Sequence, residues 1–132
     1  MSTIGKPLFA AEAALTTTGF STLANAGTMT SDAVDNSALL YDEMILEIKV
    51  GGTAAATAWL EVRLAYSIDG GTDYSTWFDS IQLPSIDMQV DNPIYHTRCV
   101  CPQRWKLMVK NNTGAVLDVG SASYQGINMQ GV

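Results

Sequence analysis

The residues with the most versatile chemistry gather in one short stretch, in which the single histidine precedes two cysteines. His96, Cys99 and Cys101 are the only residues of these types in the chain. In an extended strand, residues two apart project from the same face, so both sulfurs could reach one ion while the imidazole points away. Zinc needs four ligands in a tetrahedral array, and a disulfide needs closer side chains than this spacing gives. We therefore expect two reduced thiols, no bound metal and no cofactor.

Other catalytic arrangements would need partners that the sequence does not place at recognisable spacing. His96 has no serine nucleophile at a spacing typical of a catalytic triad. Asp69, Asp73 and Asp79 are of a type that binds calcium, but their spacing matches no 12-residue calcium loop. General acid–base chemistry needs converging carboxyl groups in a pocket, and no motif here indicates them. The sequence therefore predicts a protein that is not an enzyme and has no catalytic residues.

The elements that would position these side chains are strands with one apolar face. Met44–Val50 and Trp59–Ile68 alternate apolar and charged residues, and Arg104–Lys110 has one apolar and one mostly basic face. A period of two indicates antiparallel strands that are buried on one side. In Trp59–Ile68 the inner file is expected to continue through Tyr66 to Ile68. We expect the core to contain Leu46, Ile48, Leu60, Val62, Leu64, Trp105, Leu107 and Val109.

Two turn sequences indicate how strands are connected. Asn111–Gly114 can adopt the positive φ angles of a tight turn, so Arg104–Lys110 is expected to form a hairpin with Leu117–Ile127. Ser67–Tyr74 resembles one incomplete Asp-box, in which the Asp69 carboxylate would cap turn amides and glycine would take positive φ. A propeller would need several copies of this sequence. The single copy therefore predicts one hairpin turn.

The remaining segments carry weaker patterns. Residues 1–36 are rich in Ser, Thr, Ala and Gly and contain four charged residues. Such sequence is typical of an extended arm that becomes ordered against a partner, and an ordinary first strand with loops is the alternative. Within it, Ala10–Leu15 could form a helical turn and Phe20–Leu23 a short strand. Residues 75–93 indicate a long connection with one short strand near Ile86–Val90.

Together these elements predict the fold class. With Ile94–Val100 as a further strand, the chain has six to eight strands and no long helix. Short strands at this spacing favour an all-β, single-domain antiparallel β-sandwich, of which the jelly roll is one form. A chain of 132 residues is long enough for one such domain. We expect an N-terminal arm in residues 1–36 and a β-sandwich body in residues 37–132.

The charge distribution argues against some partners and favours others. A net charge of −6 argues against nucleic-acid binding. No apolar run is long enough to span a membrane, and no secretory signal is recognisable, so we expect a cytoplasmic product. Basic residues in 98–110 and acidic residues in 69–91 form either complementary patches that dock identical subunits or ordinary solvated surface. Exposed aromatic residues also favour an interface. The candidate interface residues are Trp77, Phe78, Arg98, Arg104, Lys106 and Lys110.

Several sequence features occur together in a fixed order. Arg104-Trp105 opens an alternating strand, Asn-x-Thr-Gly-x-x-Leu-Asp follows at 111–118, and Ser-x-Ser-Tyr stands at 121–124. Upstream, Val34–Ser37 and Leu40–Asp42 precede the strand Met44–Val50. Over roughly two thirds of the chain, this order resembles that of a group of small structural proteins of tailed bacteriophages. None of the features is a catalytic signature. The resemblance implies that the protein is a component of the virion.

The resemblance implies a capsid decoration (cement) protein that stabilises the phage head by bridging subunits of the major capsid protein. Such a protein would be made in the host cytoplasm, would lie on the capsid surface and would self-associate as a dimer or trimer. The alternative is a small binding module of a phage tail or appendage that recognises carbohydrate or a host receptor. If the N-terminal segment is an arm, removal of residues 1–30 is expected to leave the body folded and to weaken capsid binding.

Overall fold

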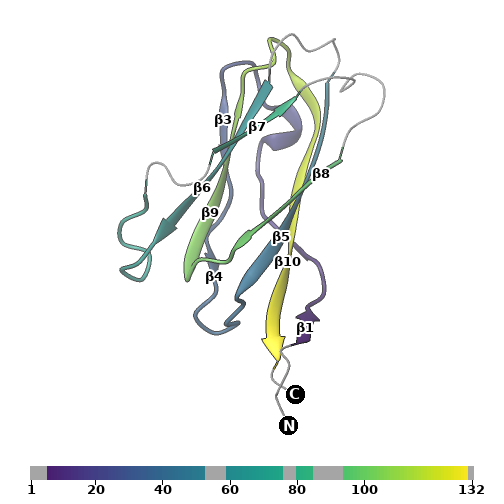
Figure 1. Ribbon diagram of the computed structural model, residues 1–132. Coiled ribbons are helices and arrows are strands. Elements are labelled where there is room, and N and C mark those ends of the chain that lie inside the picture. Colours follow the sequence, from purple (N-terminus) through teal and green to yellow (C-terminus); the bar gives the residue numbers. More distant parts are fainter. Residues whose placement is uncertain (1–5, 53–58, 76–79, 85–93, 131–132) are drawn as a thin grey trace.

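The protein is built from two antiparallel β-sheets that pack face to face, as a computed structural model shows (Figure 1). The structure describes residues 6–52, 59–75, 80–84 and 94–130. In this part of the chain the only helical element is a short 3-10 helix, η1 (Phe20–Thr22). The prediction of an all-β sandwich is confirmed. The strands are β1 (Lys6–Phe9), β2 (Ala13–Ala14), β3 (Thr28–Thr30), β4 (Val34–Asp35), β5 (Glu43–Gly52), β6 (Trp59–Ser67), β7 (Ser80–Pro84), β8 (Ile94–Val100), β9 (Arg104–Asn111) and β10 (Leu117–Gln130).

The strands pair in a nested order. One sheet runs β1-β10-β5-β8, with β2 also paired to β10, and the other runs β3-β9-β6-β7, with β4 also paired to β9. The consecutive strands β6 and β7 form the innermost pair, and the pairs β5–β8, β3–β9 and β1–β10 enclose it in turn. Most connections therefore cross from one sheet to the other, as the chain path in Figure 1 shows.

The predicted C-terminal hairpin is wrong, because β9 and β10 belong to different sheets. β9 pairs with β6, and β10 pairs with β5. At the turn between them, the buried Asn111 side chain donates to the carbonyl oxygens of Leu23 (3.0 Å) and Ala115 (2.7 Å). Thr113 donates both its N–H and its hydroxyl to Asn111 Oδ1. These bonds to groups inside the sandwich carry the chain across its end instead of back along the same sheet.

The core lies between the sheets and contains the alternating positions that the sequence predicts. All eight predicted core residues are buried, and Trp105, Leu107 and Val109 on β9 have no exposed surface. That prediction is confirmed. The inner file of β6 does not extend to Ile68, however, because the strand ends at Ser67 and Ile68 is 88% exposed. The end of β6 therefore projects a large apolar side chain into solvent.

The N-terminal segment completes both sheets. β1 and β2 pair with β10, and β3 and β4 pair with β9. The residues described between 6 and 36 are therefore part of the sandwich, so the division into an arm at 1–36 and a body at 37–132 does not describe them. The alternative prediction, an ordinary first strand with loops, is closer to the structure. Its buried apolar residues are Leu15, Phe20, Leu23 and Met29.

Two local predictions in this segment are wrong. Ala10–Leu15 contains strand β2 instead of a helical turn, since its residues 13 and 14 pair with β10. Phe20–Leu23 contains η1 instead of a strand. At η1 the chain lies close to β10, where Gly120 has no side chain and a Cβ would lie 2.5 Å from the backbone oxygen of Phe20. The N-terminal chain therefore packs its backbone directly against β10.

The region before β8 contains one strand that the sequence pattern does not reveal. β7 pairs with β6 at the edge of its sheet, where its terminal Pro84 is tolerated because an edge position need not donate to a second neighbour. The strand predicted near Ile86–Val90 lies outside the described residues. The prediction of a strand at Ile94–Val100 is confirmed. In the part of the chain that the structure describes, no helix is long and apolar enough to cross a membrane.

Candidate functional site

The histidine and the two cysteines do not converge on one point. His96 faces solvent from β8, whereas Cys99 packs half-buried against the core and Cys101 is buried just beyond the strand. Burial raises the pKa of the Cys101 thiol. Among the described residues, no three His, Cys, Asp or Glu side chains are grouped so that they could hold a metal ion. These three side chains therefore provide separate chemical groups.

The His96 imidazole belongs instead to a polar row across the outer face of its sheet. Its Nε2 lies 2.8 Å from Glu47 Oε2, and Ser123 Oγ donates to Glu12 Oε1 at 2.7 Å. Glu47 is the cross-strand neighbour of both His96 and Ser123. The row therefore runs from β8 across β5 and β10 to Glu12. Together with Ile45, Tyr124 and Gln125, these residues line a shallow depression of about 110 Å³.

This polar row has the residue types of a hydrolytic site but not its geometry. A serine nucleophile needs a base within hydrogen-bonding distance. His96 and Ser123 are separated by two strand spacings, about 10 Å, and Glu47 lies between them. The hydrogen bond with His96 holds the pKa of the Glu47 carboxyl below its ordinary value. The row therefore stabilises neighbouring strands and presents hydrogen-bonding groups, without joining a nucleophile to a base.

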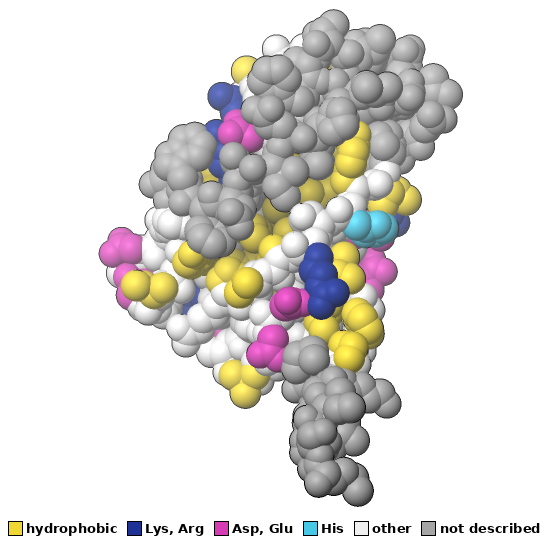
Figure 2. Space-filling view, viewed as in Figure 1, with side chains coloured by type: hydrophobic (Ala, Val, Ile, Leu, Met, Phe, Trp, Pro, Cys, Tyr) yellow, Lys and Arg dark blue, Asp and Glu magenta, His cyan; other side chains and the backbone are white. Residues whose placement is uncertain are grey.

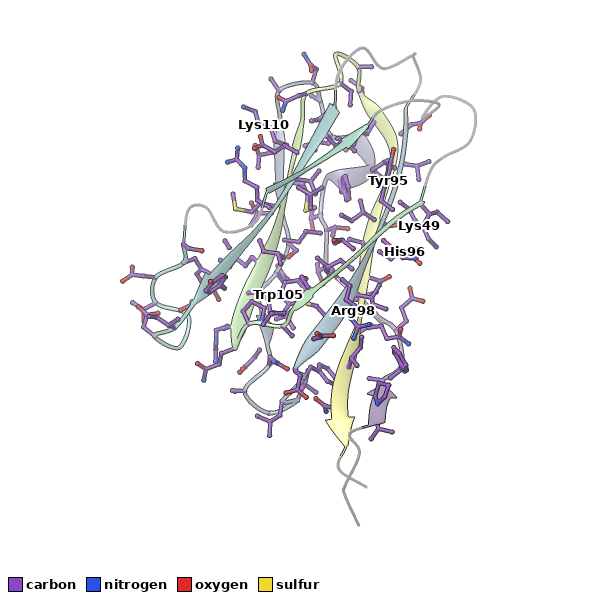
Figure 3. The ribbon with its side chains drawn as sticks, in the orientation of Figure 1. Lys49, Tyr95, His96, Arg98, Trp105 and Lys110 are labelled. Atoms are coloured by element: carbon purple, nitrogen blue, oxygen red, sulfur yellow. The ribbon has the colours of Figure 1, made fainter. Side chains whose placement is uncertain are left out.

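The predicted basic surface is divided between the two sheets. Arg98 lies on β8, whereas Arg104, Lys106 and Lys110 lie on β9 of the other sheet. Figure 3 shows Arg98 and Lys110 well separated. The basic residues of 98–110 therefore do not form one patch, because the consecutive strands β8 and β9 belong to different sheets. Three of the four side chains have local partners: Arg98 contacts Glu43, Arg104 contacts Asp35, and Lys106 lies over the ring of Tyr74.

Part of the predicted interface falls on residues whose structure is not described. Trp77 and Phe78, the two aromatic candidates, lie outside the described residues. The same holds for Asp79, Asp87 and Asp91 of the acidic segment. Docking between an acidic and a basic patch therefore stays a prediction.

A different surface gathers exposed apolar side chains at one end of the sandwich. Three connections meet there, at residues 36–42 before β5, 67–75 after β6 and 101–103 between β8 and β9 (Figure 1). Leu40, Ile68 and Val100 are 70%, 88% and 69% exposed, and we call these three residues the loop-end surface. Figure 2 shows hydrophobic side chains over this end, at the lower left. The surface borders a hollow of about 180 Å³ lined by Tyr66, Ser67, Ile68, Val100, Pro102 and Gln103.

The turn that carries Ile68 is held by side-chain hydrogen bonds. Asp69 Oδ1 accepts from Ser67 Oγ at 2.6 Å and from the amides of Thr72 and Asp73 at 3.0 Å each. The two residues after Asp69 are glycines with φ angles of 79° and 99°, which a residue with a side chain rarely adopts. The capping role predicted for Asp69 is confirmed. This turn therefore fixes an exposed apolar side chain on a rigid support.

The loop that carries Leu40 is held by a buried asparagine. Asn36 donates its side-chain N–H to the Tyr41 carbonyl oxygen and accepts the Tyr41 N–H, both at 2.9 Å. Its backbone N–H donates to the Gln103 oxygen at 2.7 Å, which joins this loop to the β8–β9 connection. Leu40 has a φ of 57°, a left-handed conformation that is uncommon outside glycine. The loop therefore holds a large apolar side chain in solvent at a cost in backbone energy.

The sequence pattern does not predict the loop-end surface. The alternation in Trp59–Ile68 places Ile68 on the inner face of its strand, and no motif marks Leu40 or Val100 as a binding residue. One signal was present, since Ile68 stands between Ser67 and Asp69 of the predicted turn. A residue inside a capped turn has no strand face to occupy. The exposure of Leu40 depends on the conformation of its loop, and that of Val100 on which face of β8 is turned to solvent.

Asp69→Asn is expected to remove an acid-sensitive contribution to stability. The hydrogen bond from Ser67, followed by those from the turn amides, holds the pKa of Asp69 below its ordinary value of 3.8. A carboxyl group with a lower pKa in the folded state stabilises the fold above its unfolded pKa and loses this contribution as pH falls through its folded pKa. Urea denaturation at about pH 5.5 and about pH 2.5 should therefore show a smaller loss of stability in the variant. An Asp69 carboxyl that titrates by NMR at or above 3.8 would contradict this expectation.

These observations define the class of the protein as an all-β sandwich with rigid, partly apolar surface loops. No protein-family description matches the sequence, and no curated protein is similar to it. Two solved structures of the exo-β-1,3-galactanase from Phanerochaete chrysosporium, with β-1,3-galactotriose and with galactose, are similar to this chain at 11% identity. Their TM-scores are 0.44 and 0.42, and the alignments cover 94% and 95% of this chain but 27% and 29% of the galactanase. The chain thus spans less than a third of that enzyme.

Proposed function

We propose that this protein is a structural component of a bacteriophage virion, a capsid decoration protein that attaches through its loop-end surface. In this role it self-associates and stabilises the head by bridging subunits of the major capsid protein. The observation that carries the proposal is the exposure of Leu40 and Ile68 on fixed loops, and of Val100 at the end of β8, at one end of the sandwich. Exposed apolar patches commonly mark surfaces that bind other proteins.

The physical argument rests on what these side chains gain when they are covered. Burial of one leucine or isoleucine side chain contributes about 1.5–3 kcal/mol. Because the turn at Asp69 and the loop at Asn36 are already held by hydrogen bonds, little further ordering is needed on binding. Leu40 has a positive φ at which glycine would be less strained, and this also fits a binding role for its side chain.

The strand order supports a fold that is well suited to a virion protein. Nested pairs around β6–β7, distributed over two facing sheets, are the arrangement we propose as a jelly roll. Jelly rolls occur in viral capsid domains and also in lectins, so the fold by itself does not decide between a capsid and a glycan partner. The resemblance of residues 34–50 and 104–124 to small structural proteins of tailed phages supports the capsid.

A structural role also agrees with the arrangement of the polar groups. The acidic, imidazole and hydroxyl groups of the outer face are engaged in pairs across the sheet, with Glu47 between His96 and Ser123. We therefore propose binding without catalysis. The second role, as a carbohydrate- or receptor-binding module of a tail or appendage, is a defined outcome of the test below.

Ile68→Ser is expected to weaken binding to undecorated phage capsids about 10- to 100-fold, since it removes one large apolar contact. The thermal unfolding midpoint should stay unchanged, because the side chain is 88% exposed in the folded protein. Leu40→Gly should weaken binding similarly while it relieves the strained φ of 57°. Cosedimentation of each variant with capsids measures the affinity, and calorimetry measures the stability.

Val116→Ser is the matched control for these variants. Val116 is also apolar and 48% exposed, but it lies in the β9–β10 turn at the other end of the sandwich (Figure 1). Its substitution should leave capsid binding unchanged. Equal losses from Val116→Ser and Ile68→Ser would show that the loop-end surface is not the attachment site. If the parent protein neither binds nor protects capsids, and instead fractionates with tails or binds glycans, the appendage role replaces the decoration role.

A further inference from the structure

One edge of the sandwich is a strand that is suited to pair with a copy of itself. β8 is the last strand of its sheet, and no described strand pairs with its second edge. Its sequence, Ile94–Val100, contains neither glycine nor proline, and Figure 1 shows it at the front of the molecule. Proteins commonly protect such edges, because an open row of amides and carbonyls pairs readily with another chain.

The hydrogen-bond pattern identifies the backbone groups on this edge. The N–H of Cys101, just beyond β8, donates to the carbonyl oxygen of Asp42 at 3.2 Å. Along an antiparallel ladder the direction of hydrogen bonding alternates from residue to residue. The backbone N–H and C=O groups that point toward β5 are therefore those of Tyr95, Thr97, Cys99 and Cys101. The groups that point to the open edge are those of Ile94, His96, Arg98 and Val100.

We propose that a second copy of this chain pairs its β8 antiparallel to this edge, about a twofold axis at Thr97. In this register His96 lies opposite the Arg98 of the partner subunit, and Ile94 lies opposite the partner's Val100. All four outward residues of each copy then exchange backbone hydrogen bonds with the other. The two sheets become one continuous sheet across the axis. This inference specifies the self-association included in the proposed function.

The apolar side chains are complementary in this register. Ile94 and Val100 stand at the two ends of β8 on its outer face and are 53% and 69% exposed. About the axis at Thr97, each of them meets the other type in the second copy. A cross-strand pair of apolar side chains contributes to the stability of a sheet. Both exposed ends of the strand are therefore covered by the same pairing.

The charged side chains distinguish this register from its neighbours. Arg98 and His96 contact Glu43 and Glu47 of β5, so each copy supplies a carboxylate for its own basic side chain. A register moved by one hydrogen-bonded step would place Arg98 against Arg98, or His96 against His96. Each such register also leaves one apolar end without a partner. The twofold axis at Thr97 is therefore the arrangement that the strand favours.

The small area and the antiparallel orientation of this strand pair fit a protein that binds to an assembled capsid. A strand pair alone buries less than the roughly 1,600 Å² of a standard interface, so the dimer is weak in solution. Attachment to a shell raises the effective concentration of neighbouring copies and strengthens pairing. Because the strands are antiparallel, the two loop-end surfaces lie at opposite ends of the joined sheet. Pairing takes Val100 out of the loop-end surface, because the partner's Ile94 covers it. Leu40 and Ile68 are not on β8, so they stay exposed and can contact two different capsid subunits.

A matched pair of substitutions at one position tests the edge without capsids. Arg98→Ala and Arg98→Pro both remove the contact with Glu43, but only proline removes the N–H that points to the open edge. Sedimentation from about 1 µM to about 1 mM should show reversible dimers for the parent and for Arg98→Ala. Arg98→Pro should dimerise at least about tenfold more weakly, with the same circular dichroism spectrum as Arg98→Ala.

Cross-linking tests the register. In a background with Cys99→Ser and Cys101→Ala, Thr97→Cys places two thiols at a non-hydrogen-bonded pair, where Cα atoms are about 4.5 Å apart and a disulfide can form. Oxidation with diamide should therefore yield a covalent dimer. Ile94→Cys in the same background is the control, since its two copies would lie about 20 Å apart. Only the Thr97 variant should cross-link.

Each outcome of these measurements decides the proposal. A parent that stays monomeric at about 1 mM, or a dimer that Arg98→Pro does not weaken, overturns pairing through β8. Cross-linking through the Ile94 variant and not the Thr97 variant overturns the register. Because neither measurement uses capsids, a dimer that fails to bind capsids would contradict the proposed function alone.

Discussion

Trp105→Ala is expected to lower the free energy of unfolding by about 3–5 kcal/mol, a large share of the roughly 5–15 kcal/mol that stabilises a typical domain. The Trp105 side chain has no exposed surface. Its ring meets the ring of Tyr124 edge to face, with centroids 5.3 Å apart. Because Trp105 lies on β9 and Tyr124 on β10, this contact joins the two sheets across the core. Urea denaturation followed by circular dichroism measures the loss.

Trp105→Phe is the matched control for this substitution. Phenylalanine keeps an aromatic ring against Tyr124 and leaves a smaller cavity, so the loss should fall to about 1–3 kcal/mol. If both variants unfold at the same urea concentration as the parent, Trp105 is not the residue that holds the sheets together.

Removal of residues 1–30 is expected to unfold the protein, in contrast to the expectation for a free arm. The deletion takes away β1, β2, η1 and β3, which pair with or pack on β10 and β9. It also removes Leu15, Phe20, Leu23 and Met29 from the core. At about 1.5–3 kcal/mol each, these four side chains account for roughly 6–12 kcal/mol, comparable with the whole stability of a domain. An amide NMR spectrum of the truncated chain should show collapsed dispersion.

A pair of point substitutions separates packing from chain length in this segment. Phe20→Ala should cost about 3–5 kcal/mol, because its side chain is fully buried. Thr18→Ala, two residues earlier and exposed, should change stability by less than about 0.5 kcal/mol. A well-dispersed spectrum from the truncated chain, together with a neutral Phe20→Ala, would restore the interpretation of residues 1–36 as an arm.

The strands that the sequence predicts well are those whose own side chains alternate. Met44–Val50, Trp59–Ser67 and Arg104–Lys110 are strands in the structure, because a buried inner face imposes a period of two on every such segment. The same pattern cannot show which strand lies next to which. The predicted C-terminal hairpin is wrong for this reason, since the turn at Asn111 can connect two strands of one sheet or two strands of different sheets. Asn111 donates hydrogen bonds to Leu23 and Ala115 at this turn, and Leu23 is 88 residues away in the sequence.

The N-terminal strands and the candidate sites depend on information held elsewhere in the chain. β2 and β4 each have two residues, too few to display any period. Their positions are set by β10 and β9, against which they pair. The polar row of His96, Glu47 and Ser123 likewise arises from strand register, and no spacing in the sequence reveals it. Only Asp69 was predictable in its role, because a capped turn is a local structure.

The position of β10 after all of its partner strands has a consequence for the timing of folding. β10 pairs with β1, β2 and β5 and packs against η1, so these earlier elements emerge from the ribosome before their partner exists. Until β10 is made, the apolar faces and strand edges that it covers have nothing native to contact. Pairings between distant segments also form slowly, on a scale of roughly milliseconds to seconds. The sandwich can therefore close only after β10 has been synthesised, and the earlier strands stay exposed to non-native contacts until then.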